Sequence, residues 1–543
     1  EFVVPPLALP PDVASPDAPT VADADAVQLF LARARDIRPD LAVDAATLAD
    51  IAAICRRLDG LPLAIELAAA RVNVLPPAAL RQRLSERLRL LTGGARDAPE
   101  RQRTLRDTIA WSYDLLSPAE QRFFQRLAVF AGGWTLEAAT AVAADPDLGI
   151  DPLDAQTELI DQSLAFLASS PGAAGEPRYG MLETIREYAL DRLAASDEMV
   201  AIRRRLIDYL IAFAEQADAG LQGPDQASWL DRLDADHDNL RAALGQTLEA
   251  GDGPTALRLT SALWRFWRNR GYSDEGRGWL VRALGCGPTA PPALQAAARD
   301  GLGHLAIELG DYPAARLAFD EARQLFERLD DQKGLADALS GLGVVAVNVQ
   351  AYDEAAGLHR RALAIRHEIG DRRGEAHSLR NLGVVARERG NFAEATTLQQ
   401  RSLAIWRELG ESVWIAHALL ALGGLSRLQG RDDEAQRQCA DSLALLERLG
   451  DRFGQAVAET QLGHLARAAG DPPGAMARYG AALADFRAIG VREGIIESIE
   501  WIAGVAADLG RADRAVPLFA AATRWRADLG LPPPSASDAA VIA

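Results

Sequence analysis

Small and apolar residues recur with a period of 40 positions along the second half of the chain. Leucine–glycine pairs begin at positions 302, 342, 382, 422 and 462, and an isoleucine–alanine pair at 502 continues the series. An alanine stands 12 residues after each of these small residues, and alanine or serine follows seven residues later. Because a helix pair cannot bury its apolar face alone, the pattern predicts six stacked helix pairs over residues 293–530. The expected architecture there is an α-solenoid superhelix.

The first 200 residues predict smaller helical units. Apolar residues at helical spacing form one face: Leu48, Ile51, Ile54 and Leu58. Pro62 can begin the next helix, so residues 24–92 are expected to form four short helices. Residues 103–195 predict three helices, a further helix over 153–166, a Pro/Gly-rich turn at 171–177 and a short strand before a helix at Glu183. Helices followed by such a hairpin are typical of a winged-helix domain.

These elements predict an all-α protein in five parts. A linker and small helical bundle occupy residues 1–100, and the winged helix occupies 101–196. A helical linker with degenerate repeats follows over 197–292, then the repeats at 293–530 and a tail at 531–543.

The charge balance excludes binding of nucleic acid or anionic membrane by the chain as a whole. There are 58 basic and 76 acidic residues, a net charge of −18. The predicted winged helix has arginines that could meet phosphates (Arg101, Arg103, Arg106, Arg122 and Arg126), but nearby acidic residues dilute their charge. We therefore expect no direct contact with nucleic acid.

No run of 18 apolar residues exists to span a membrane, and the three cysteines lie far apart, so a reducing, cytoplasmic location is expected.

The sequence offers no catalytic or metal-binding constellation. Lys333 is the only lysine, and the P-loop motif GxxxxGK[ST] is absent. The motifs HExxH and GxSxG are absent as well. We expect this chain not to be an enzyme.

Three segments carry a resemblance to a known family. Gly60, Leu61, Pro62 and Leu63, within CRRLDGLPLAIELAAAR, resemble the GLPL motif of NB-ARC-type STAND proteins, the signal-transduction ATPases with numerous domains. Residues 101–139 resemble the winged helix of their bacterial transcriptional-regulator branch. The spacing of small residues resembles the tetratricopeptide repeat (TPR), with a period of 40 instead of 34 and with Gly370, Gly410, Gly450 and Gly490 ending the second helices. The resemblance covers residues 1–530.

The resemblance implies that a P-loop domain outside this chain binds ATP or ADP, so no cofactor is expected within it. In the family, the GLPL proline packs beside the adenine, the winged helix holds the closed state, and activation leads to oligomers. The histidine that contacts phosphate in the family's MHD motif aligns with Leu182, which cannot donate a hydrogen bond. Two plainer interpretations stay open: Glu183 caps the positive end of a helix, and Pro62 is only a first-turn proline.

The repeats contain candidate ligand-binding residues. Arg387, Arg427 and Arg467 occupy the same position in three successive units, and stacking should align them along one groove. His377, Arg380 and His417 are expected on the same inner face. The planar guanidinium can clamp carboxylates or phosphates of a ligand or acidic peptide. The alternative is a solvated row of arginines paired with neighbouring acids.

Together these features predict the sensor portion of a STAND-type ATP-dependent signalling protein, a transcriptional regulator, whose TPR superhelix receives an effector or partner protein. Two alternatives remain: a free-standing TPR scaffold without nucleotide dependence, and a subunit of an ATPase whose P-loop is supplied by another chain.

Overall fold

A computed structural model describes residues 7–10, 21–38, 41, 43–73, 75–83, 105–168, 176–223 and 225–528. The chain divides into two compact units, Glu1–Arg270 and Gly271–Ala543. The division falls inside the segment predicted as helical linker and repeat cap. Arg101, Arg103, most of the predicted turn at 171–177 and the tail at 531–543 lie outside the described residues.

The first unit begins with four short α-helices, in the region where the sequence predicts four. They are α1 (Asp25–Ile37), α2 (Ala45–Arg57), α3 (Pro62–Ala70) and α4 (Pro77–Arg83), with 3-10 turns at Val21–Asp23 and Arg71–Asn73. The Asp44 side chain starts α2 by accepting a hydrogen bond from the Thr47 amide at 2.8 Å. Phe30, Ile51 and Ile65 are fully buried between these helices.

A second group of helices surrounds a small sheet. It comprises α6 (Leu105–Asp114), α7 (Pro118–Leu127), β1 (Trp134–Thr135), α8 (Leu136–Ala143), a 3-10 turn at Pro146–Leu148, α9 (Pro152–Asp161), β2 (Phe166–Leu167), β3 (Arg178–Gly180) and α10 (Glu183–Ala194). The strands are antiparallel in the order β1-β3-β2. The short strand predicted before Glu183 is confirmed as β3.

The helix predicted over 153–166 ends earlier than the sequence suggests. Ser163 has a left-handed backbone (φ 57°), and the amides of Leu164 and Ala165 both turn back to the Leu159 carbonyl at 2.8 and 3.1 Å. This turn ends α9 at Asp161 and leaves Phe166 free to enter the sheet. The prediction was wrong here because apolar spacing alone does not reveal a left-handed residue outside glycine.

The rest of the first unit is helical: α11 (Met199–Gly220), α12 (Gln226–Ala235), α13 (His237–Glu249) and α14 (Gly253–Arg270). Side chains at the start of α13 hold the loop that leads into β1. The Asn239 side-chain oxygen accepts hydrogen bonds from the Ala131 and Gly132 amides at 2.7 and 2.9 Å. Arg178 on β3 pairs with Asp236 at 3.0 Å. These contacts join the sheet to α12 and α13.

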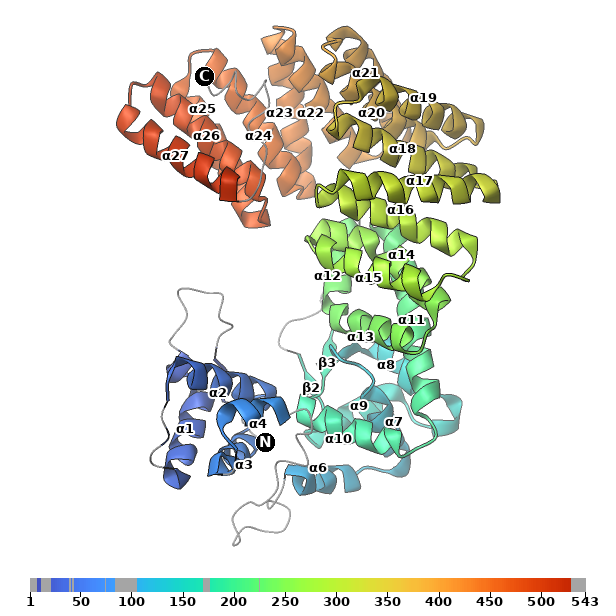
Figure 1. Cartoon of the computed structure of the whole chain (residues 1–543), viewed down its shortest axis with the longest axis vertical. Helices are drawn as coiled ribbons and strands as arrows, with labels where there is room; N and C mark the ends of the chain where they lie inside the picture. The colour runs from blue at the N-terminus through green and yellow to red at the C-terminus, as the bar shows by residue number, and fades with distance from the viewer. Residues whose placement is uncertain are drawn as a thin grey trace. The chain divides into compact units, whose positions relative to one another are not determined.

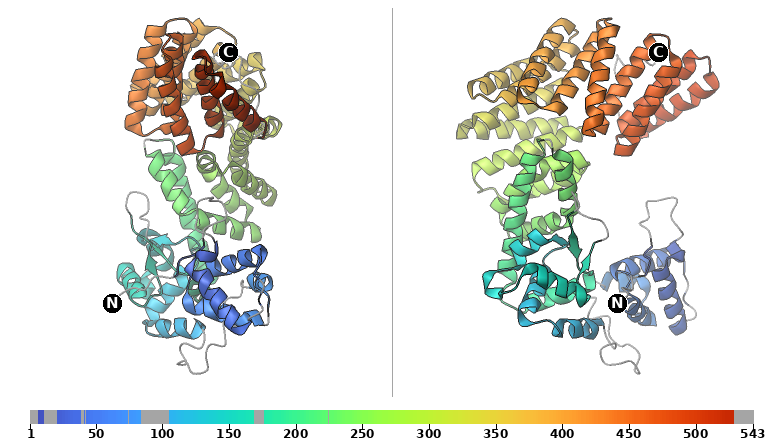
Figure 2. Two further views of the ribbon diagram at one scale, coloured as in Figure 1. Left: turned by 90° about the vertical axis from the view of Figure 1, so that its left-hand side faces the viewer. Right: turned by 180° about the vertical axis from the view of Figure 1, so that it is seen from behind.

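The second unit consists of α15 (Ser273–Cys286) followed by six helix pairs, which Figure 1 and Figure 2 show stacked in chain order. The pairs are α16 (Pro292–Glu308) with α17 (Tyr312–Leu329), α18 (Gln332–Asn348) with α19 (Tyr352–Glu368), α20 (Arg372–Glu388) with α21 (Phe392–Leu409), α22 (Ser412–Leu428) with α23 (Asp432–Leu449), α24 (Arg452–Ala468) with α25 (Pro472–Ile489), and α26 (Arg492–Asp508) with α27 (Ala512–Asp528). The prediction of stacked helix pairs is confirmed.

The repeated glycines make room for side chains from the second helix of each pair. A Cβ on Gly303 would lie 2.7 Å from the Phe319 ring, and one on Gly463 would lie 2.5 Å from the Tyr479 ring. The same arrangement recurs in every full Leu–Gly unit, with a residue 16 positions after the glycine lying against it. At the end of the second helices, Gly370, Gly410, Gly450 and Gly490 have left-handed backbones, and Asp330 takes the same conformation after α17.

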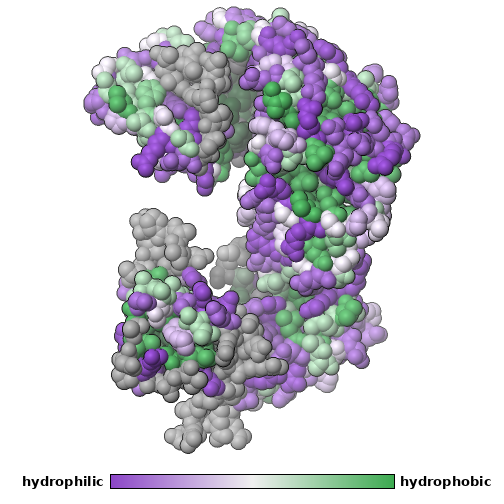
Figure 3. Space-filling model, viewed as in Figure 1, coloured by the Kyte–Doolittle hydropathy of each residue, from purple (hydrophilic) through white to green (hydrophobic). Residues whose placement is uncertain are grey.

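No helix in the described part of the chain is both long and apolar enough to cross a membrane. On the face drawn in Figure 3, hydrophilic and apolar residues are interspersed.

Candidate functional site in the central repeats

The residue that lies against each repeat glycine changes character along the array. In chain order it is Phe319, His359, Gln399, Cys439 and Tyr479. The outer units place an aromatic ring there, whereas the units in the middle place smaller or polar groups. His359 is 1% exposed, and its Nδ1 has no hydrogen-bond partner among the residues that the structure describes. The core of the central repeats is therefore more polar than the fold requires.

A second core position, near the end of each second helix, also varies along the array. Its residues are Phe326, Arg366, Trp406, Leu446, Phe486 and Arg526. Arg366 is only 5% exposed. Its guanidinium donates to the Ser378 hydroxyl at 2.7 Å and to the Asp337 carboxylate at 2.6 Å. A charged group thus occupies the interior between α18, α19 and α20.

Trp414 replaces a glycine that four other units keep. The equivalent residues are Gly334, Gly374, Gly454 and Gly494. The Trp414 ring stacks on Trp406, with centroids 5.5 Å apart and an interplanar angle of 21°. The His377 ring lies edge-on to both indoles, at 4.8 Å from Trp406 and 4.5 Å from Trp414. These three side chains form an aromatic cluster at the start of α22.

Arg380 lies beside this cluster. Its guanidinium donates a hydrogen bond to the Asn381 side-chain oxygen at 3.0 Å, and its buried Nε has no hydrogen-bond partner in the described part of the chain. Its guanidinium carbon lies 5.7 Å from the centre of the Trp414 ring, within the range of a cation–π contact. Burial lowers the pKa of this guanidinium. Among the described residues, no carboxylate forms an ion pair with Arg380.

Two histidines near Arg380, His377 and His359, have pKa values well below pH 7. Burial, followed by repulsion from Arg380 and Arg366, lowers the pKa of His377 to about 3. Burial and the same two arginines lower the pKa of His359 to about 4. The positive charge of the site therefore belongs to its arginines, and the histidine rings act as polar, uncharged walls.

The structure brings together only part of the predicted groove. His377, Arg380 and Trp414 are neighbours, and His417 lies 5.9 Å from Trp414 while its Nε2 lies 3.0 Å from the Asp451 carboxylate. The row of three arginines has local partners instead. Arg387 contacts Glu388 at 2.6 Å, Arg427 contacts Gln461 at 3.2 Å, and Arg467 contacts Asp508 at 2.6 Å.

Three of the five arginines that the sequence offered for phosphates lie in the described part of the chain, and all three pair with acidic residues. Arg106 pairs with Asp191 at 3.1 Å. Arg122 pairs with Glu198, and Arg126 is buried between Glu198 and Asp145.

A hydrogen bond joins Glu183 to Asp59, which directly precedes the Gly60 motif, and the sequence analysis did not predict it. The Glu183 amide, at the start of α10, donates to the Asp59 carboxylate at 3.0 Å. Leu182 stands at the N-cap position of α10, but its side chain makes no capping hydrogen bond. The carboxylate of Glu183 pairs with Arg186 at 2.6 Å instead of closing the helix end. Asp59 therefore supplies the cap, from the turn that precedes the Gly60 motif.

The GLPL segment itself has a constrained backbone. Asp59 and Gly60 both have left-handed backbones (φ 54° and 68°), and Leu61 and Pro62 form the N-cap and first position of α3. The side chain of Leu63 lies outside the described part of the structure. Gly60 also accepts a hydrogen bond from the Leu7 amide at 3.0 Å.

We expect Gly60→Ala to lower the free energy of unfolding of the first unit by about 1–3 kcal/mol, because alanine disfavours a positive φ. The added Cβ would also lie 2.4 Å from the Leu7 carbonyl oxygen. Gly245→Ala is the control, since Gly245 lies in the middle of α13 with nothing within 4 Å of a new Cβ. That change should stabilise α13 by about 0.5–1 kcal/mol. Urea unfolding followed by circular dichroism gives both values, and equal effects would refute the backbone argument.

Comparisons with known proteins agree with the repeat geometry. Residues 334–408 and 374–447 match the tetratricopeptide repeat family. This chain contains tetratricopeptide repeats. The TPR chain is 42% identical over 266 residues to the protein named Putative HTH-type transcriptional regulator Rv0890c of Mycobacterium tuberculosis. It is 44% identical over 188 residues to Uncharacterized protein Rv0894 of the same organism.

These matches cover parts of the proteins concerned. The first spans 48% of the TPR chain and 29% of the relative, and the second spans 34% and 47%. A solved STAND protein with a tetratricopeptide repeat sensor, from Pyrococcus horikoshii, superposes with a TM-score of 0.44 at 12% identity, covering 92% of this chain and 72% of that one. A Rap protein complexed with Competence and Sporulation Factor gives 0.46 at 11% identity, covering 64% and 93%.

We expect Arg380→Met to stabilise the central TPR units by about 1–2 kcal/mol, because it replaces a partly buried charge that lacks a counter-ion with an apolar side chain of similar length. Native-state hydrogen exchange of α20–α22 measures the change. Arg387→Met is the control, because Arg387 is exposed, and it should change stability by less than about 0.5 kcal/mol. A marked loss of protection in Arg380→Met would mean that the guanidinium is already compensated.

Proposed function

We propose that this chain is the regulatory portion of a STAND-type, ATP-dependent transcriptional regulator whose TPR array receives an effector. The observation that carries the proposal is the 42% identity over 266 residues to a protein named as an HTH-type transcriptional regulator. The proposal is restricted to regulation, because the P-loop motif is absent from the sequence of this chain.

The effector site that we propose is the central cluster around Arg380. An arginine with a buried Nε and no carboxylate partner destabilises the free protein, and a ligand carboxylate or phosphate would offset that cost. The pKa of His377 is lowered to about 3, so the charge that attracts the anion would come from Arg380. Trp414 supplies a flat apolar wall. The chemistry therefore favours an anionic effector with an apolar portion, such as an acidic peptide.

The first unit would couple effector binding in the repeats to nucleotide binding by a separate P-loop domain. By resemblance, the four-helix bundle with Gly60 and Pro62 packs beside ATP or ADP held by a separate P-loop domain. Residues 101–196 would be the winged helix that keeps that domain closed. The Asp59–Glu183 hydrogen bond joins the two elements, so a change in either would reach the other. Effector binding would favour the open state, nucleotide exchange and oligomers.

The native polypeptide tests the proposal directly. An antibody raised against residues 292–528 should isolate from the source cells a protein well above the 58.2 kDa of this chain. Its sequence should contain a P-loop, and the purified protein should bind ATP. A native protein of 58.2 kDa that binds its partner without nucleotide would instead establish the free-standing scaffold.

Nucleotide titration distinguishes our proposal from the alternative in which another chain supplies the P-loop of an ATPase. This chain alone should bind neither ATP nor ADP in isothermal calorimetry. Hydrolysis that arises only after mixing with a different P-loop protein would support an ATPase assembled from two chains and contradict our proposal.

A further inference from the structure

A cavity of about 530 Å³ lies between α19, α20 and α21, apart from the cluster around Arg380. Glu375 and Leu379 line it from α20. At 100° per residue, these two side chains project to the side of α20 opposite His377. One helix thus has a different candidate surface on each of its two sides.

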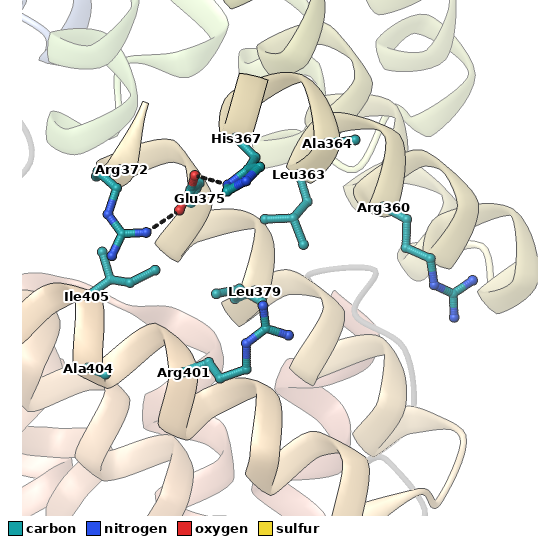
Figure 4. Close-up of a pocket in the computed structure, with 10 residues that line it drawn as sticks. All are labelled: Arg360, Leu363, Ala364, His367, Arg372, Glu375, Leu379, Arg401, Ala404 and Ile405. Atoms are coloured by element: carbon teal, nitrogen blue, oxygen red, sulfur yellow. Dashed lines mark hydrogen bonds and ion pairs between the residues drawn. The ribbon is translucent and has the colours of Figure 1, made fainter. Parts of the chain in front are cut away.

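The floor of the cavity is aliphatic. Leu379 and Ile405 are buried and Leu363 is half-buried, as Figure 4 shows for the side chains that point into the space. The rim residues Ala364 and Ala404 are exposed, so the cavity opens to solvent along both second helices. A small molecule would be poorly enclosed here, because small-molecule sites bury most of their ligand. An open cavity with this floor suits one side chain of an extended peptide.

The charges around the cavity are unbalanced. Glu375 already contacts His367 at 2.9 Å and also contacts Arg372, which is drawn with dashed lines in Figure 4. Arg360 and Arg401 lie on the rim and form no hydrogen bond or ion pair with any residue in the described part of the chain. Two exposed guanidiniums therefore stand beside an aliphatic floor with no acid of their own.

We propose that this outer cavity binds an acidic segment of a partner protein, with one aliphatic side chain on the floor and flanking carboxylates at Arg360 and Arg401. Charge complementarity favours this occupant, since both arginines are free for bidentate pairing. A nucleic acid would instead need a longer basic track. This site is separate from the effector site proposed above and stands without it.

The test uses the full chain of 543 residues and fluorescence anisotropy of a labelled probe peptide, acetyl-DELDE-amide. We expect the double variant Arg360→Gln, Arg401→Gln to weaken binding about tenfold or more, because two charge-assisted contacts are lost. The matched control is Arg407→Gln, Arg437→Gln, which removes two exposed arginines outside the cavity and should change binding less than about twofold. Equal weakening in both double variants would show diffuse charge attraction and overturn the proposal.

A second pair of variants places a charge or a neutral amide at the rim of the cavity without disturbing the core. Ala404 is exposed on α21, so both Ala404→Glu and Ala404→Gln should fold. Glutamate should abolish binding of the probe by repulsion, whereas glutamine should retain it. The peptides acetyl-NQLNQ-amide and acetyl-DESDE-amide should each bind more weakly than the probe. Probe binding unaffected by Ala404→Glu, or wild-type binding no tighter than about 1 mM, would exclude the site.

Arg380→Met separates the two proposals. This variant should bind the probe as the wild type does, because Arg380 does not line the outer cavity. Loss of probe binding in Arg380→Met, together with retention in the Arg360/Arg401 variant, would place the acidic peptide in the inner cluster and overturn the outer site.

Discussion

Arg126→Met is expected to lower the free energy of unfolding of the first unit by about 2–4 kcal/mol, because it removes a buried guanidinium that gives charge-assisted hydrogen bonds to two partly buried carboxylates. The Arg126 guanidinium contacts Glu198 through two nitrogens, both at 2.9 Å, and Asp145 at 2.6 Å. It also donates to the Ala143 carbonyl at 3.0 Å. The loss should appear in native-state hydrogen exchange of α7, α8 and the start of α11, which these contacts join.

Arg122→Gln is the matched control, since Arg122 contacts the same Glu198 from a side chain that is 44% exposed. Its effect should stay below about 1 kcal/mol, as for other exposed ion pairs. If both variants lost the same amount, the buried position of Arg126 would not be the source of its stabilisation.

The same network gives a pH signature with a defined sign. The hydrogen bond from Arg126, partly opposed by burial, lowers the pKa of Glu198 from 4.5 to about 2. A carboxyl group whose pKa is lowered by folding stabilises the folded state above its unfolded pKa, and this contribution disappears as the pH falls from 4.5 towards 2. Wild type should therefore lose more stability than Arg126→Met over that range. Parallel pH curves for the two proteins would contradict the assignment.

The fold of the repeats could be predicted from the sequence alone. The period of 40 predicts the six helix pairs because each small residue has a steric role that every unit must fill. The structure shows what that role is at two of the glycines: Gly303 and Gly343 make room for the rings of Phe319 and His359. A periodic constraint of this kind is visible in one sequence without any alignment.

The candidate site around Arg380 lies where residues depart from the 40-residue period. Only some of its members are predicted from the sequence. Arg380 and His377 were predicted from the inner face, but Trp414 was not, although its replacement of a repeat glycine is visible in the sequence. Arg366 could have been found in the same way. The outer cavity could not, because Arg360 and Arg401 differ from other exposed arginines in lying beside an aliphatic floor, and that placement is a property of the three-dimensional structure.

The first unit was harder to predict in detail because its key contacts join distant segments. The Asp59–Glu183 hydrogen bond spans 124 positions, and no local pattern indicates it. The early end of α9 depends on a left-handed serine, which propensities do not anticipate.

We expect Phe319→Ala to destabilise the start of the repeat array by about 3–5 kcal/mol, because a large ring is removed from a fully packed position. Phe319 is fully buried, and its ring fills the space left by both Gly303 and Gly341. Stacked repeats contact only their neighbours, so the loss of protection in hydrogen exchange should be concentrated in α16–α18 and should fade towards α27. Leu317→Ala, on the exposed side of the same helix, should cost less than about 0.5 kcal/mol.

The glycine side of this contact gives an independent check. Gly341→Ala would place a Cβ 2.4 Å from the Phe319 ring, and this overpacking should cost about 1–3 kcal/mol even though alanine favours helices. Combined with Phe319→Ala, the same substitution should cost less, because the ring it collides with is gone. If the two losses simply added, Gly341 would not serve to accommodate the Phe319 ring.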